Sequence, residues 1–277
     1  MRYFIILTVL LGAYEFLFKE YLFVVYRETY FGFRALDEKL FSGSTNVFRA
    51  KVFFEGPLAL SQFAIGAAFL FRKHIKVLFL ILLISIFANG RLGIIICAGI
   101  IALYYVKKYN LLTILLKPKY FFLLIFGLLF SFTVIYLLLD ESSIERFKNS
   151  FDTSNEGNAA RITFWINGIK TWLSYDLAHL IFGNNGYYGS IYKNNAENGW
   201  ITLLVNNGII GFLYYFIPVL LLSINYLIKA SVNFWYIFLL FFCMFVQTFH
   251  LGASANLFYW LIIFSFLNTT YDNKISL

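Results

Sequence analysis

The chain has 277 residues, of which 61% are hydrophobic and only 13% are charged, and its formal net charge is +8. A chain this apolar cannot cover its hydrophobic residues with a soluble surface, so the composition excludes an ordinary soluble domain and predicts an integral membrane protein. The two cysteines, Cys97 and Cys243, lie in apolar runs, which indicates packing and neither a disulfide framework nor a metal site.

The apolar runs predict an all-α, polytopic membrane fold with about eight transmembrane helices. The first run lacks the small-residue cleavage site of a secretory signal, so we expect it to be retained as a span. The Asn89–Gly93 motif NGRLG separates two short runs. The predicted spans are 3–18, 57–71, 77–88, 94–106, 120–139, 199–223, 234–249 and 255–267.

Polar sequence divides these spans into three predicted domains. Residues 1–139 hold the first five spans and an outer loop at 19–56, residues 140–198 form a large polar loop, and residues 199–277 hold the last three spans. The large loop carries seven of the fourteen carboxylates. We therefore expect its polar residues to carry the chemistry.

The positive charges predict the orientation of the chain. If the N-terminus is cytoplasmic and every run crosses, the inner side holds ten cations and one carboxylate, whereas the outer side holds twelve of each. Because short inner loops are rich in Lys and Arg, both termini are expected to be cytoplasmic and the 140–198 loop to lie outside. An anionic inner leaflet accounts for the net charge, and no nucleic-acid partner is needed.

The large loop is expected to contain an amphipathic helix capped by Asn158, with 152–157 as the preceding turn. Arg161 and Trp165 share a face of this helix because they are four residues apart. Its apolar residues recur at helical spacing, which favours a helix lying on the outer membrane surface: Ile162, Trp165, Ile166, Ile169, Trp172 and Leu173. The Gly183–Gly186 segment GNNG is a turn signal.

The order of these motifs is similar to that of a known family. FRAKVFFEGP precedes a span, NGRLG joins two short spans, R-x-x-x-W begins the outer helix, and IFGNNGYYG and ENGWITLLVNNGIIGF follow. This order resembles the bacterial O-antigen polymerase and ligase family, the Wzy and WaaL proteins, over roughly residues 48–216. The matching positions are Arg49, Arg91, Arg161 with Trp165, Gly183 with Gly186, and Glu197-Asn198 ahead of Gly208 and Gly211.

The resemblance implies a glycosyltransferase in the bacterial inner membrane that uses undecaprenyl-pyrophosphate-linked glycans to build O-antigen or capsular polysaccharide. Its partners would be these glycans, membrane lipids and a chain-length regulator protein. Glu197 stands where the ligases usually have histidine, which favours a polymerase over a ligase. The predicted spans are fewer than such proteins usually have, so we expect the chain to lack the family's first few spans.

The residues also support this chemistry on physical grounds. The predicted topology places Arg49, Arg91 and Arg161 on the outer side, near membrane depth, where a guanidinium is costly and tends to mark function. Arginine matches phosphate oxygens, so these residues, with Trp165, are the expected pyrophosphate site. No D-x-D pair is present, so neither a metal nor another cofactor is expected.

Glu197 and Asn198, together with Arg161, are the candidate catalytic residues, and Asn185 and His250 are secondary candidates. Glu197 is the expected general base for an acceptor hydroxyl. Its alternative role is structural, because a carboxylate ahead of a helix also stabilises the helix dipole. The rival functions are a ligase that joins polymer to lipid A core and a transporter or flippase of lipid-linked sugar.

Overall fold

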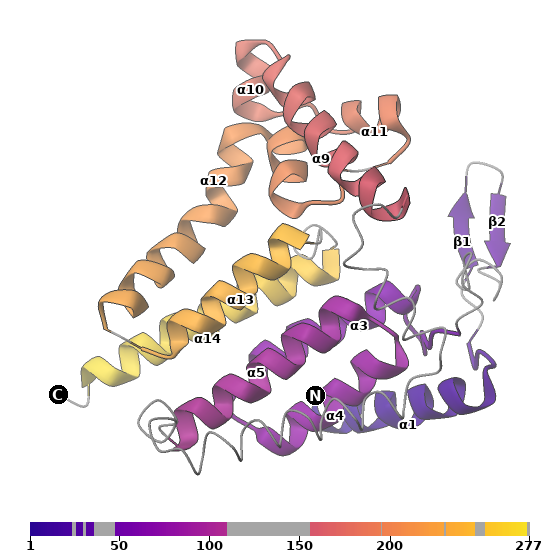
Figure 1. Cartoon of the computed structure of the whole chain (residues 1–277), viewed down its shortest axis with the longest axis vertical. Coiled ribbons are helices and arrows are strands. Elements are labelled where there is room, and N and C mark those ends of the chain that lie inside the picture. Colours follow the sequence, from indigo (N-terminus) through magenta and orange to yellow (C-terminus); the bar gives the residue numbers. More distant parts are fainter. Residues whose placement is uncertain are drawn as a thin grey trace. The chain divides into compact units, whose positions relative to one another are not determined.

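The computed structural model describes residues 1–23, 26–29, 32–35, 48–109, 156–194, 196–229, 231–246 and 253–275 (Figure 1). The chain divides into two compact units, Met1–Phe151 and Asp152–Leu277. The helical class that the apolar runs predict is confirmed, since all described elements except one short hairpin are helices.

The first unit is built around a group of apolar helices, and α4 contacts the other three. The helix α3 begins with Pro57, which is tolerated there because the first turn has no partner for a backbone N–H. Its bounds, like those of α1 and α4, lie within two residues of the predicted spans. The helices are α1 (Arg2–Phe18), α3 (Pro57–Leu70), α4 (Ile75–Phe87) and α5 (Arg91–Tyr109).

The turn between α4 and α5 packs closely against α3. A Cβ atom added to Gly90 would lie 2.2 Å from Ser61 Oγ, and one added to Gly93 would lie 2.5 Å from the same atom. Both glycines are therefore needed for the close approach of these helices. The predicted interruption of the apolar run at NGRLG corresponds to this turn.

Glu15 fixes the end of α1 to the segment that precedes α3. Its side chain is fully buried, and its carboxylate accepts hydrogen bonds from the backbone N–H groups of Leu22 (3.1 Å), Lys51 (2.9 Å) and Val52 (2.8 Å). Lys51 is also buried, and its ammonium donates to the Phe23 carbonyl oxygen. Burial lowers the pKa of Lys51, and the nearby charge of Glu15 opposes that effect.

One short hairpin departs from the all-α prediction. Strands β1 (Tyr26–Thr29) and β2 (Gly32–Ala35) pair antiparallel within the predicted 19–56 loop, with Tyr26 opposite Ala35 and Thr29 opposite Gly32. Aromatic residues and threonine favour strands. The sequence does not predict the hairpin, because strands of four residues give too short an alternation of apolar and polar residues.

The second unit is organised around its longest helix, α12, which contacts α9, α10, α13 and α14. The helices are α9 (Glu156–Leu173), α10 (Leu177–Phe182), α11 (Tyr187–Tyr192), α12 (Gly199–Ile228), α13 (Asn233–Val246) and α14 (Ala253–Ile275). Asn158 was predicted to cap the amphipathic helix, and this is wrong, because α9 already begins at Glu156.

The helix α12 is interrupted at Gly208, whose φ of 64° and ψ of −166° lie in a region that is essentially restricted to glycine. The predicted GNNG turn lies against this interruption, and Asn184 N donates to Val205 O at 3.0 Å. A Cβ atom on Gly183 would lie 2.3 Å from Asn207 N, and one on Gly208 would lie 2.3 Å from Ile181 O. The two segments therefore meet backbone to backbone.

Two helices within the described ranges, α5 and α12, are long and apolar enough to cross a membrane. The helices α3, α4 and α13 and the Asn256–Asn268 part of α14 are apolar but shorter. The predicted span 120–139 lies outside the described residues. By length and composition, the structure thus supports two candidate membrane spans.

Candidate functional site

Arg161 and Glu197 form an ion pair within the second unit. Arg161 lies in α9 and Glu197 lies two residues before α12, and Arg161 Nε donates to Glu197 Oε2 at 3.0 Å. Their side chains are 51% and 31% exposed. Two residues that the sequence analysis assigned to one site are therefore in contact.

The second oxygen of Glu197 is also bonded, since Asn194 Nδ2 donates to Glu197 Oε1 at 3.1 Å. The backbone of Glu197 has a φ of 52°, in the left-handed region that non-glycine residues rarely adopt. The described bonds of the carboxylate are thus directed to α9 and to the loop after α11.

Asn198 is the N-cap of α12. Its Oδ1 accepts hydrogen bonds from Trp200 N at 3.0 Å and Ile201 N at 3.1 Å. The residue is fully buried, and its Nδ2 has no hydrogen-bond partner in the described parts of the chain. These contacts give Asn198 a capping role. Its catalytic role stays a prediction.

Trp165 lies one turn after Arg161 in α9 and packs toward α13. Its ring contacts Phe245 edge-on, with the ring centroids 5.4 Å apart. The indole Nε1 is buried, and no hydrogen-bond partner for it lies among the described residues. Trp165 therefore supports the helix that carries Arg161, and its predicted contact with pyrophosphate stays a prediction.

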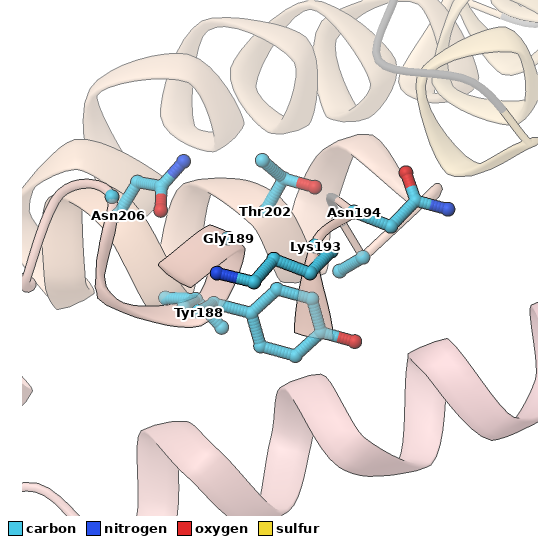
Figure 2. Close-up of a pocket in the computed structure, with 9 residues that line it drawn as sticks. Tyr188, Gly189, Lys193, Asn194, Thr202 and Asn206 are labelled. Atoms are coloured by element: carbon cyan, nitrogen blue, oxygen red, sulfur yellow. The ribbon is translucent and has the colours of Figure 1, made fainter. Parts of the chain in front are cut away.

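A pocket of about 410 Å³ opens between α11, the segment that follows it and the first turns of α12 (Figure 2). Tyr188 forms one wall, and its hydroxyl donates to Phe164 O at 2.9 Å. Burial is the main cause that raises the pKa of Tyr188 to about 12, so the phenol is neutral at physiological pH. The lining residues are Gly186, Tyr188, Gly189, Lys193, Asn194, Ala196, Thr202, Val205 and Asn206.

The pocket adjoins the ion pair, because Asn194 belongs to both. Asn194 lines the pocket while its amide bonds Glu197, and Ala196 lines the pocket directly before Glu197. Of the pocket residues, only Gly186 lies in a motif that the sequence analysis had singled out as a turn. Thr202 and Asn206 were missed, although their four-residue spacing at the start of an apolar helix marks one polar face.

Arg49 and Arg91 lie at the same turn of the first unit. Arg49 Nε donates to Ala88 O at 3.1 Å, at the end of α4, and Tyr21 Oη donates to the Arg49 carbonyl oxygen at 3.2 Å. Arg91 begins α5, three residues after Ala88. The expected position of both arginines on the outer side, near membrane depth, stays a prediction.

The remaining candidates are placed as follows. Asn185 is exposed in the turn between α10 and α11. His250 lies outside the described residues. Comparison with protein-family models, curated proteins and solved structures finds no match for this chain.

Proposed function

We propose that the chain is a polysaccharide polymerase of the bacterial inner membrane, with about eight spans and its large loop in the periplasm. It transfers a glycan from undecaprenyl pyrophosphate to a hydroxyl of a second lipid-linked repeat unit. The product is a longer O-antigen or capsule-like chain. Support comes from the order of sequence motifs and from the chemistry of Arg161 and Glu197.

The observation that carries the proposal is the exposure and hydrogen bonding of the Arg161 guanidinium. It is half-exposed, and its one described hydrogen bond runs from Nε to Glu197. Glu197 thus orients the planar group before a ligand binds, and the terminal nitrogens make no described hydrogen bond. A planar guanidinium that keeps its charge is suited to bind phosphate oxygens with two parallel hydrogen bonds.

The proposed reaction uses both members of the ion pair. The acceptor hydroxyl attacks the anomeric carbon, the bond from that carbon to the pyrophosphate oxygen breaks, and the hydroxyl proton passes to Glu197. Arg161 stabilises the negative charge that develops on the departing pyrophosphate. Because the ligand and Glu197 compete for one guanidinium, pyrophosphate binding releases Glu197 Oε2 to act as the base.

The proposal includes contact of α9 with lipid. Ile162, Ile166, Ile169 and Leu173 are exposed along one side of this helix. Such an aliphatic stripe next to cationic residues fits a helix that lies at the membrane surface. Arg161 would then lie at the depth of a lipid-linked pyrophosphate. Pyrophosphate binding by Arg49 and Arg91 stays a prediction from the sequence.

The test is complementation of a polymer-negative strain, with chain length measured on a gel. Arg161→Ala is expected to abolish long chains, since loss of one such donor slows a reaction by about 100-fold to 1000-fold. Arg91→Ala is expected to do the same. Lys170→Ala removes an exposed cation from the same helix and is the matched control, with chain length unchanged.

Full-length polymer from both Arg161→Ala and Arg91→Ala contradicts the mechanism. In a deletion strain, single repeats that are still attached support a polymerase. Polymer that accumulates unattached indicates a ligase instead.

A further inference from the structure

The pocket beside Glu197 contains a buried hydroxyl without a partner. Thr202 is only 6% exposed, and its Oγ1 has no hydrogen bond to any described part of the chain. A buried hydroxyl is normally bonded, because removal from water without a replacement bond is unfavourable. Since Thr202 lines the pocket, a polar ligand there would supply the missing bond.

Two further polar side chains line the same space. Asn206 follows Thr202 by one turn of α12, so both lie on one face of that helix. Lys193 ends α11 with a left-handed backbone (φ of 54°). In Figure 2 its side chain extends between Thr202 and Tyr188, with the ammonium at the side of Asn206. Hydrogen-bond donors therefore converge on the pocket.

The walls leave room for a flat, hydroxyl-rich ring. A Cβ atom added to Gly186 would meet nothing within 4 Å, and one added to Gly189 would approach only Asn194 O, at 3.9 Å. The hydroxyl of Tyr188 is occupied by Phe164 O, which leaves its ring as an apolar wall. The volume of about 410 Å³ lies in the range of small-molecule sites.

The charge of the pocket favours an acidic ligand. Lys193 is the one charged residue in the described lining, which holds no carboxylate. The neighbouring carboxylate, Glu197, is already bonded to Arg161. A negatively charged group would thus meet a cation and no described carboxylate within the pocket itself.

We propose that this pocket binds one sugar residue that bears a carboxylate, with Thr202 and Asn206 bonding its hydroxyls and Lys193 bonding its acidic group. This inference rests on the proposed function and names a substrate class for it. A sugar held here lies next to Glu197, so the pocket would present an acidic repeat unit to the general base.

The test is binding of methyl β-glucuronide to the full chain in lipid nanodiscs, measured by saturation-transfer NMR. Methyl β-glucoside is the uncharged comparison. The glucuronide is expected to bind about tenfold more tightly, because a charge-assisted hydrogen bond to Lys193 is added. Equal binding of both sugars, or of neither, overturns the proposal.

Variants assign the binding to the pocket. Thr202→Val keeps the side-chain shape, removes the hydroxyl and is expected to weaken both sugars by about tenfold. Lys193→Gln is expected to weaken only the glucuronide. Thr171→Val is the matched control, because Thr171 is also 6% exposed but lies outside the pocket lining. This variant should bind both sugars as tightly as the wild type does. Wild-type sugar binding by Thr202→Val, in a sample with a wild-type melting temperature, contradicts the assignment.

Binding of farnesyl pyrophosphate to the same samples distinguishes a failure of the sugar pocket from a failure of the proposed function. Binding that is lost in Arg161→Ala and kept in Thr202→Val supports two distinct subsites. If farnesyl pyrophosphate binds but Thr202→Val leaves sugar binding unchanged, only the pocket assignment fails. If farnesyl pyrophosphate displaces the glucuronide from the pocket, the pocket is a phosphate site and the sugar assignment is wrong. If farnesyl pyrophosphate does not bind the wild type, the proposed function fails.

Discussion

The contact between Arg161 and Glu197 contributes little to the stability of the chain. Both side chains are partly exposed, and ion pairs of this kind typically contribute about 0–1 kcal/mol. A ligand can therefore separate the pair at small cost. Because Asn194 holds the other oxygen of Glu197, we expect the carboxylate to stay in place in the proposed pyrophosphate complex.

Gly208 is a residue at which a single methyl group should destabilise the second unit. Gly208→Ala is expected to cost at least about 2 kcal/mol, because its backbone region is strained for other residues and its Cβ would clash with Ile181 O. Gly189→Ala is the control, since its Cβ meets nothing closer than 3.9 Å. Thermal unfolding in detergent measures the difference, and equal melting temperatures for the two variants would contradict the close approach.

Tyr188 should make stability depend on pH at the alkaline end. Its folded-state pKa of about 12 lies above the ordinary value of 10.0, so its contribution is complete below pH 10 and is lost as the pH rises toward 12. Tyr188→Phe is expected to show a smaller loss over this interval than the wild type. Chemical unfolding at pH 9, 10 and 11 gives the comparison, and parallel curves for both proteins would exclude a raised pKa.

Helical periodicity predicted most elements but could not tell which apolar side chains face the protein. The predicted apolar face of α9 divides in the structure. Trp165 contacts Phe245. Trp172 packs against the buried cluster of Tyr188, Ala196 and Val205. The aliphatic residues of the same predicted face are exposed. The reason is that the spacing of residues gives a helix face, while the partner of each side chain depends on segments far away in the sequence.

The exposed stripe of α9 is expected to contact lipid. A nitroxide on Ile166→Cys should be more accessible to oxygen than to a water-soluble nickel reagent. One on Ser190→Cys, exposed on α11 and outside the stripe, should show the reverse. The native cysteines are buried, so labelling is selective. The measurement is electron paramagnetic resonance in nanodiscs, and equal accessibility at both positions would place the stripe away from lipid.

On the scale of the whole molecule, the sequence predicted segments better than it predicted their assembly. Apolar runs separate membrane from loop, which gave three predicted domains, whereas the chain forms two units. The second unit joins α9, α10 and α11 of the predicted loop to α12, through glycine contacts and the Asn194–Glu197 bond. The candidate site shows the same difference. Arg161 and Glu197 stand out in the sequence as charged residues. The spacing of Thr202 and Asn206 marks a polar helix face, but only the structure shows that Thr202 is buried and lines the pocket.

The predicted topology has a direct test in intact cells. Ser190→Cys, exposed on α11, should react with a membrane-impermeant maleimide, because the loop that contains it is expected outside. Lys229→Cys, exposed at the end of α12, should react only after lysis. The opposite pattern would reverse the orientation and place Arg161 on the cytoplasmic side.

The Glu15 carboxylate also has a consequence for the order of folding. Its backbone donors include Lys51 and Val52, which are synthesised after the whole of α1. Until they arrive, α1 carries a carboxylate without these donors, and burial of such a group is costly. The final packing of α1 is therefore reached only after residues 51 and 52 have been synthesised.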